Sequence, residues 1–151
     1  LGSMKTARDR GAVQSAVANS ARYDVFQLGE AALAGDVARA LRILDGLRAE
    51  GAEPPLVLWA VCRELRALAD QRNGVARRVF GAAAERHESL VKRAAARTAR
   101  QPIAAWFAAA ARVDREFKGQ AGAAAGDAWT TLTGLVAALA GAPLPAASAR
   151  A

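Results

Sequence analysis

Apolar residues recur at helical spacing along most of this chain, and glycine, proline and aspartate residues separate the runs. The clearest pattern lies in residues 20–65, where it predicts three amphipathic helices joined by two short turns. Gly35 is expected to end the first helix and Asp36 to cap the second, because glycine readily adopts the left-handed C-cap conformation and aspartate accepts backbone hydrogen bonds. Gly51 then ends the second helix and Pro54 opens the third.

Each of these three helices is predicted to bury one face. Asp24 is placed to cap the first helix, and charged side chains of the second helix, such as Arg39 and Asp45, point away from its apolar face. The predicted buried faces comprise Val25, Leu28, Ala32 and Leu33, then Val37, Ala40, Leu41, Leu44 and Leu47, then Leu58, Val61, Cys62, Leu65 and Leu68.

Helical segments continue through the second half of the chain. A short helical piece is predicted around residues 75–84, and a separate helix follows around Leu90. Pro102 restarts the pattern, Gly119 ends it, and a last helix begins near Asp127. The apolar stripes of these helices are Leu90, Val91, Ala94 and Ala95, then Ile103, Trp106, Phe107, Ala110, Val113 and Phe117, then Trp129, Leu132, Leu135, Val136 and Leu139.

The fold class follows from this series of segments. Turns of two to six residues force neighbouring helices to pack antiparallel, and no segment alternates as a strand does. The sequence therefore predicts an all-α protein, a compact antiparallel helical bundle of about six helices. Its core is expected to include Leu44, Trp59, Leu65, Trp106, Phe107 and Leu135.

Five short motifs occur in a fixed order along the first three predicted helices. They are residues 24–26 (DVF), 34–36 (AGD), 40–48 (ALRILDGLR), 50–54 (EGAEP) and 63–66 (RELR). In this order they resemble the C-terminal collar domain of the delta subunit of bacterial DNA polymerase III, a subunit of the clamp loader.

A weaker match closes the same domain. Residues 117–119 at a helix end and 127–129 before a final apolar helix are similar to its last segment, so the resemblance covers roughly residues 15–141. Some delta subunits are expected to present an aromatic residue to DNA from the loop before the final helix. Residues 120–127 contain none, and Trp129 lies on the apolar stripe, where core packing is the expected role.

The resemblance also implies a division of the chain. Residues 1–4 look like a remnant of an expression vector, and residues 5–19 resemble the end of a preceding lid domain or form a linker helix. Residues 20–141 are then the helical collar domain, and residues 142–151 a disordered tail.

The implied function is structural. A collar domain holds delta in the loader ring beside the gamma/tau and delta prime subunits, for sliding-clamp loading in DNA replication. Contact with the sliding clamp is left to an N-terminal region that precedes this chain, and contact with primer-template DNA is possible.

The candidate chemistry points away from catalysis. Cys62 is the single cysteine, which excludes an internal disulfide and a cysteine-rich metal site, and it is interpreted as a core residue. A nucleophilic pair with His87, the single histidine, remains an alternative without a third residue to orient it. Gly119, Gly122 and Gly126 lack the Gly-Lys-Ser/Thr ending of a phosphate-binding loop. We therefore expect no enzymatic activity, no cofactor and no metal in this chain, although the parent complex is a DNA-directed DNA polymerase.

The distribution of charge carries the functional signal that is independent of the resemblance. Ten Lys or Arg and four Asp or Glu fall between Arg63 and Arg100, so this segment holds +6 of the formal net charge of +7. Such a cluster can bind phosphates by releasing their counterions. A solvated face without a ligand is the alternative. The candidate DNA phosphate contacts are Arg77, Arg78, Arg86, Lys92, Arg93, Arg97 and Arg100.

Location and competing functions complete the sequence-based prediction. No stretch reaches ~18 uninterrupted apolar residues and the N-terminus lacks an apolar secretory core, so we expect a cytoplasmic protein without a membrane span. An independent helical module that binds DNA without sequence specificity is the alternative function. A helical-repeat scaffold is a third, weakened because the helix pairs share no period.

Overall fold

The structure is a computed structural model that describes residue 21 and residues 24–119 and 127–142. It is all-helical, with six helices and no strand in this part of the chain. The first helix covers residues 24–33. It is followed by α2 (Val37–Ala49), α3 (Pro54–Arg72), α4 (Ala82–Arg97), α5 (Ile103–Phe117) and α6 (Ala128–Leu139). The predicted fold class is confirmed.

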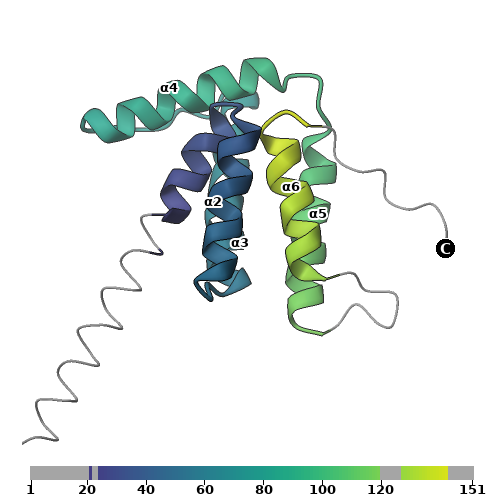
Figure 1. The fold of residues 1–151 in the computed structure, drawn as a ribbon. Helices are drawn as coiled ribbons and strands as arrows, with labels where there is room; N and C mark the ends of the chain where they lie inside the picture. The colour runs from purple at the N-terminus through teal and green to yellow at the C-terminus, as the bar shows by residue number, and fades with distance from the viewer. Residues whose placement is uncertain (1–20, 22–23, 120–126, 143–151) are drawn as a thin grey trace, which may run out of the picture.

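Helices α2, α3, α5 and α6 run up and down, and α4 lies across their end (Figure 1). α6 packs against α2, α3 and α5, and α3 packs against α4 and α5. This central position suits α6, which contains no charged residue. α4 lies across the end of the bundle where the first helix and α6 both terminate, so it departs from the antiparallel arrangement of the other helices.

Most helix ends form where the sequence predicts them. Gly35, Gly51 and Gly119 have positive φ values of 78°, 81° and 72°, the left-handed conformation that ends a helix. Asp36 accepts a hydrogen bond from the backbone N–H of Arg39 at 3.1 Å, and Asp127 caps α6 in the same way. The predicted cap at Asp24 is wrong, because Asp24 is itself helical and Ala21 before it is helical too.

The predicted core is largely present, with corrections among the aromatic residues. Trp106 is 1% exposed, whereas Trp59 is 48% exposed and is not a core residue. Phe107 packs against the core but is only partly buried, and Phe117 is exposed. The largest fully buried side chains are Trp106, Leu28, Leu33, Leu44, Leu47, Leu65, Leu68, Leu132, Leu135, Leu139, Val25 and Val57.

The helical piece predicted for residues 75–84 is wrong. Residues 75–80 have no regular structure, Gly81 has a φ of 92°, and α4 begins at Ala82 and continues without a break to Arg97. Val75, Val79 and Phe80 suggest a helical stripe by their spacing, yet Val75 and Phe80 are exposed. An apolar stripe that meets no neighbouring helix gains nothing from burial and does not hold a helix together.

Several sequence predictions fall outside the described residues. These are the vector remnant at 1–4, the lid-derived or linker helix at 5–19, most of the loop at 120–127 and the tail beyond residue 142. None of the described helices combines the length and the hydropathy that a bilayer crossing requires.

Candidate functional site

The predicted phosphate contacts gather on two connected segments. Arg77 and Arg78 lie in the irregular segment 75–80, and Arg100 lies in the turn after α4. The other four are on α4 itself: Arg86, Lys92, Arg93 and Arg97. The structure therefore brings the cationic segment together around one helix, with Glu85 and Glu88 as the acidic residues in the same stretch.

All seven cations are exposed, and six of them have no polar partner among the described residues. We refer to these six as the basic surface, and they are Arg77, Arg78, Arg86, Lys92, Arg93 and Arg100. None of them takes part in the side-chain hydrogen bonds or ion pairs formed within the described part of the chain. A cation without an internal partner keeps its charge available to an anionic ligand.

Arg97 differs from the other six because its guanidinium is partly buried against two helix ends. Its Nη2 group donates to the carbonyl oxygens of Ala32 and Leu33, both at 3.3 Å, and of Leu139 at 3.2 Å. These carbonyls end the first helix and α6, where the helix dipole leaves partial negative charge. Arg97 thus joins the C-terminal ends of two helices to α4, and desolvation by burial lowers the pKa of its guanidinium.

Two glycines make room for this contact. A Cβ atom on Gly35 would lie 3.3 Å from Nε of Arg97, and one on Gly141 would lie 3.2 Å from Nη1. Both residues have positive φ, 78° and 118°, so the backbone conformation that ends each helix also opens the space for the guanidinium. We call Arg97 with its three carbonyl partners the helix-end clamp.

A second arginine repeats the arrangement at the end of α4. Arg72, at the C-terminal end of α3, donates from Nη1 to the carbonyl of Gln101 at 3.0 Å and from Nη2 to the carbonyl of Thr98. Its Nε is buried and has no hydrogen-bond partner among the described residues. Three helix ends in this region, those of the first helix, α4 and α6, are therefore contacted by an arginine from another helix.

A hydrogen bond between the buried Glu64 and the partly buried His87 connects α3 to α4. Glu64 is 2% exposed, and its Oε2 lies 2.6 Å from Nε2 of His87. Because an ionised carboxylate only accepts hydrogen bonds, the ring nitrogen is the donor. Oε1 accepts from Nη1 of Arg63 at 3.2 Å, and the carboxylate packs so closely on Gly29 that a Cβ there would lie 3.0 Å from Oε1.

An aromatic patch lies at the surface between the first helix and α3. The rings of Phe26 and Trp59 meet edge to face at 75° with centroids 6.0 Å apart, and the guanidinium of Arg63 lies 5.1 Å from the Phe26 centroid. Phe26 is 42% exposed and Trp59 48% exposed. We call these three residues the aromatic patch.

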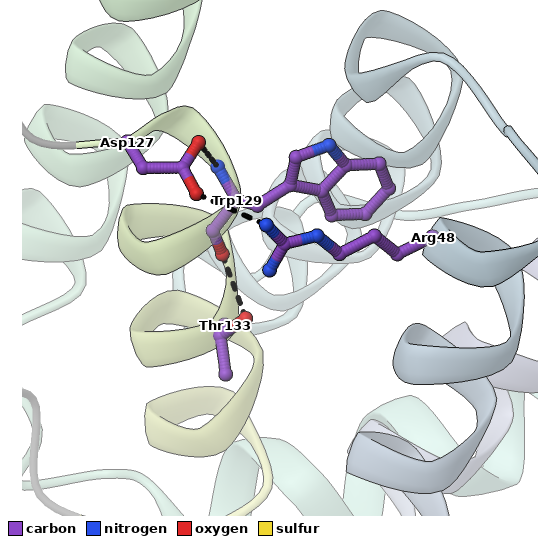
Figure 2. A network of polar contacts seen from close by, with 4 residues as sticks. All are labelled: Arg48, Asp127, Trp129 and Thr133. Carbon is purple, nitrogen blue, oxygen red and sulfur yellow. Dashed lines mark hydrogen bonds and ion pairs between the residues drawn. The ribbon is translucent and has the colours of Figure 1, made fainter.

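The predicted core residue Trp129 is only partly buried and belongs to a polar network (Figure 2). The Arg48 guanidinium lies 5.8 Å from its ring centroid and 3.4 Å from Asp127, which caps α6 by accepting from the Trp129 N–H at 3.2 Å. Thr133 donates to the Trp129 carbonyl at 2.7 Å. This cluster fixes the start of α6 against α2, which is a structural role for the residues that match the closing motif.

Among the described residues, no hydrogen bond joins Cys62 to His87. His87 is engaged with Glu64, and burial raises the pKa of the Cys62 thiol, with Asp114 adding to the rise and Arg66 opposing it. A raised pKa leaves less thiolate, the reactive form. Within the described residues, no three His, Cys, Asp or Glu side chains are grouped to hold a metal ion.

Sequence reasoning located the basic surface but missed the polar contacts inside the bundle. The sequence suggests only Cys62 as a partner for His87, places Glu64 in a motif without a contact, does not single out Arg72, and groups Arg97 with the other candidate phosphate contacts. Each of these contacts joins residues at least 23 positions apart, and no periodic pattern marks such a pair.

Comparison with protein-family models, with curated proteins and with solved structures gives no match for this chain.

Proposed function

We propose that this chain is a non-catalytic collar domain of a clamp-loader subunit resembling bacterial delta, and that it holds its subunit in a ring by packing against neighbouring helical domains. The support is the ordered series of motifs in residues 24–66, together with the way in which their residues divide between the core and the surface. The cytoplasm is the compartment that this function requires.

Burial explains only part of the motif series. Val25 and Leu65 are fully buried, so any bundle with these helices would need apolar residues there. Phe26 and Arg63 belong to the same motifs, yet both contribute to the exposed aromatic patch. An exposed aromatic ring adds nothing to the core, so a second surface is the simplest physical reason for it.

The aromatic patch has the composition of an interface centre, and it is the structural observation that carries the proposed site of contact. Trp and Arg are enriched among residues that dominate binding energy, and aromatic rings supply large rigid contact area. The edge-to-face pair of Phe26 and Trp59 fixes both rings before any partner arrives, which lowers the entropy lost on binding. We therefore place the contact with a neighbouring collar on the first helix and α3.

The test uses a full-length delta-type protein that contains this domain. Phe26→Ser with Trp59→Ser should prevent its assembly with gamma/tau and delta prime subunits, measured by analytical ultracentrifugation, while binding to the sliding clamp persists. Phe117→Ser, at an exposed phenylalanine on α5, is the matched control and should assemble normally. Normal assembly of the double variant would refute the placement, and normal assembly after deletion of residues 20–141 would refute the collar function itself.

A second candidate function is supported by a different observation, the six unpaired cations of the basic surface. Here the domain binds the phosphates of nucleic acid without sequence specificity. Reversing the charge of Arg86, Lys92 and Arg93 should weaken binding to duplex DNA and lower the slope of log K against log salt by about 0.9 for each lost phosphate contact. The control is Arg42→Glu with Arg115→Glu, at exposed arginines on α2 and α5. An unchanged slope would leave the basic surface as a solvated face.

A further inference from the structure

Phe80 is the most exposed large apolar side chain among the described residues, at 81%. It lies in the segment 75–80, two and three positions after the unpaired cations Arg78 and Arg77. Among the described residues, the ring makes no aromatic or cation–π pair of the kind that holds Phe26. The phenyl ring is therefore largely exposed to solvent, beside two cations that have no polar partner in this part of the chain.

The fold fixes the path of this segment along α4. Arg72 at the end of α3 reaches the carbonyls of Thr98 and Gln101, which follow the C-terminal end of α4. The chain must then return to the start of α4 at Ala82, and a helix of 16 residues is about 24 Å long. An extended chain advances about 3.3 Å per residue, so residues 75–80 need an open conformation to cover most of that length, in agreement with their lack of regular structure.

The exposed side of α4 completes the surface. Arg86 and Arg93 are seven positions apart and Lys92 adjoins Arg93, and all three are exposed, whereas Val91, Ala94 and Ala95 face the bundle. An extended segment with two arginines and a phenylalanine thus accompanies a helix whose outer face is also cationic. The two elements together present a charged track with one aromatic ring near its end.

We infer that this track binds single-stranded nucleic acid, with Phe80 stacking on an unpaired base and Arg77 and Arg78 contacting the adjoining phosphates. Aromatic rings with nearby cations bind single strands without sequence preference, because every base has a π face and every nucleotide a phosphate. Bases inside a duplex are already stacked on their neighbours, so Phe80 can reach a base only in a single strand or at a strand end. The positive charge of this region selects a polyanion as the ligand over an apolar protein surface.

This inference deepens the second candidate function by naming the form of nucleic acid, and it does not depend on the collar assignment. Stacking and charge make separate contributions to the binding affinity, and a salt titration can distinguish them. Stacking on Phe80 contributes affinity that is insensitive to salt, whereas the arginines contribute affinity that falls as salt rises.

The experiment measures fluorescence anisotropy of a labelled dT20 strand titrated with the 151-residue chain, over a series of salt concentrations. Phe80→Ala and Phe80→Leu should each weaken binding between about 5-fold and about 150-fold without changing the salt slope. Phe80→Trp should restore wild-type affinity, because the indole also stacks, and its fluorescence should be quenched when dT20 binds. Arg77→Glu with Arg78→Glu should lower the slope by about 0.7 for each lost phosphate contact.

Two controls keep the result specific. Phe117→Ala removes another exposed phenylalanine and Arg42→Glu with Arg115→Glu removes two other exposed arginines, and both should leave dT20 binding unchanged. A blunt duplex of 20 base pairs should lose little affinity with Phe80→Ala. The inference is overturned if the wild-type chain does not bind dT20, if Phe80→Leu binds as well as Phe80→Trp, or if the duplex loses as much as the single strand. Loss of collar assembly by the Phe26 and Trp59 variant is measured separately and bears only on the other proposal.

Discussion

Replacing Arg97 by methionine should destabilise the domain by about 3 kcal/mol. The guanidinium donates from one Nη2 group to three carbonyls at 3.2 to 3.3 Å, and that group carries two hydrogens, so the contacts amount to two full hydrogen bonds. Bonds to charged groups contribute about 1.5 kcal/mol each at the lower end of their range, which suits distances this long. Methionine preserves the apolar stem of the side chain and removes only the donors.

Arg97→Lys provides a graded comparison. Lysine keeps the positive charge beside the two helix ends, which contributes roughly 0.3 to 1 kcal/mol at such a position, but it lacks the planar fork. We therefore expect a loss of about 2 kcal/mol. Arg93→Met, one turn earlier on the exposed side of α4, is the matched control and should stay within about 0.5 kcal/mol of wild type.

Urea denaturation followed by far-ultraviolet circular dichroism measures these differences directly. In a domain of this size each kcal/mol shifts Tm by about 4 °C, so Arg97→Met should melt about 12 °C below wild type. A loss within about 1 kcal/mol of the Arg93→Met control would show that the helix-end clamp is not a stabilising contact. It would also return Arg97 to the set of cations available for phosphate.

Three further predictions concern the interior. His87→Ala should lower the free energy of unfolding, measured by urea denaturation, by about 3 kcal/mol, because it leaves the buried Glu64 carboxylate with only a partly exposed Arg63 partner. Adding Glu64→Leu should recover most of the lost stability. Trp106→Ala should cost ~3 to 5 kcal/mol and Trp59→Ala less than ~1.5 kcal/mol, since the first side chain is fully buried and the second about half exposed; equal losses would contradict this burial. The Cys62 thiol should react with a disulfide reagent more slowly in the folded chain than in urea. Because burial raises the pKa of this thiol, the reaction rate of the folded chain should keep rising with pH after the rate of the unfolded chain has levelled off. Equal rates in the two states would show that the thiol is open to solvent.

The sequence predicted the helices of the first half well because local residues decide their ends. Gly35, Asp36 and Gly51 each act within their own turn, so a reader of the sequence needs no knowledge of the fold to place them. The apolar spacing of α2 and α6 likewise identifies their buried faces. The failures begin where a residue's role depends on a distant segment.

Trp59 and Arg97 illustrate that limit. Residues 56–61 on α3 are all apolar, so periodicity does not reveal which side of the helix faces the core, and Trp59 falls on the outer side. Arg97 has the composition of an exposed cation, and only the meeting of two helix ends 42 and 64 residues away makes it a structural residue. Among the cations, the sequence could predict the charge of the surface but not which arginine contacts the carbonyls of other helix ends.

The attachment of α4 has a consequence for motion in the native state. Its buried residues are Val91, Ala94 and Ala95, which are small, and the contacts made by His87, by Arg97 and by Arg72 at its end are polar. Proteins open in cooperative units whose free energies range from near zero to that of global unfolding, and a helix held by few apolar contacts belongs to the lower part of that range. α4 should therefore detach as a unit while α6 stays folded, and its amide protons should exchange with deuterium well before those of α6. Since three of the six cations of the basic surface lie on α4 itself, a bound polyanion would slow exchange in α4 selectively, without any change in the core.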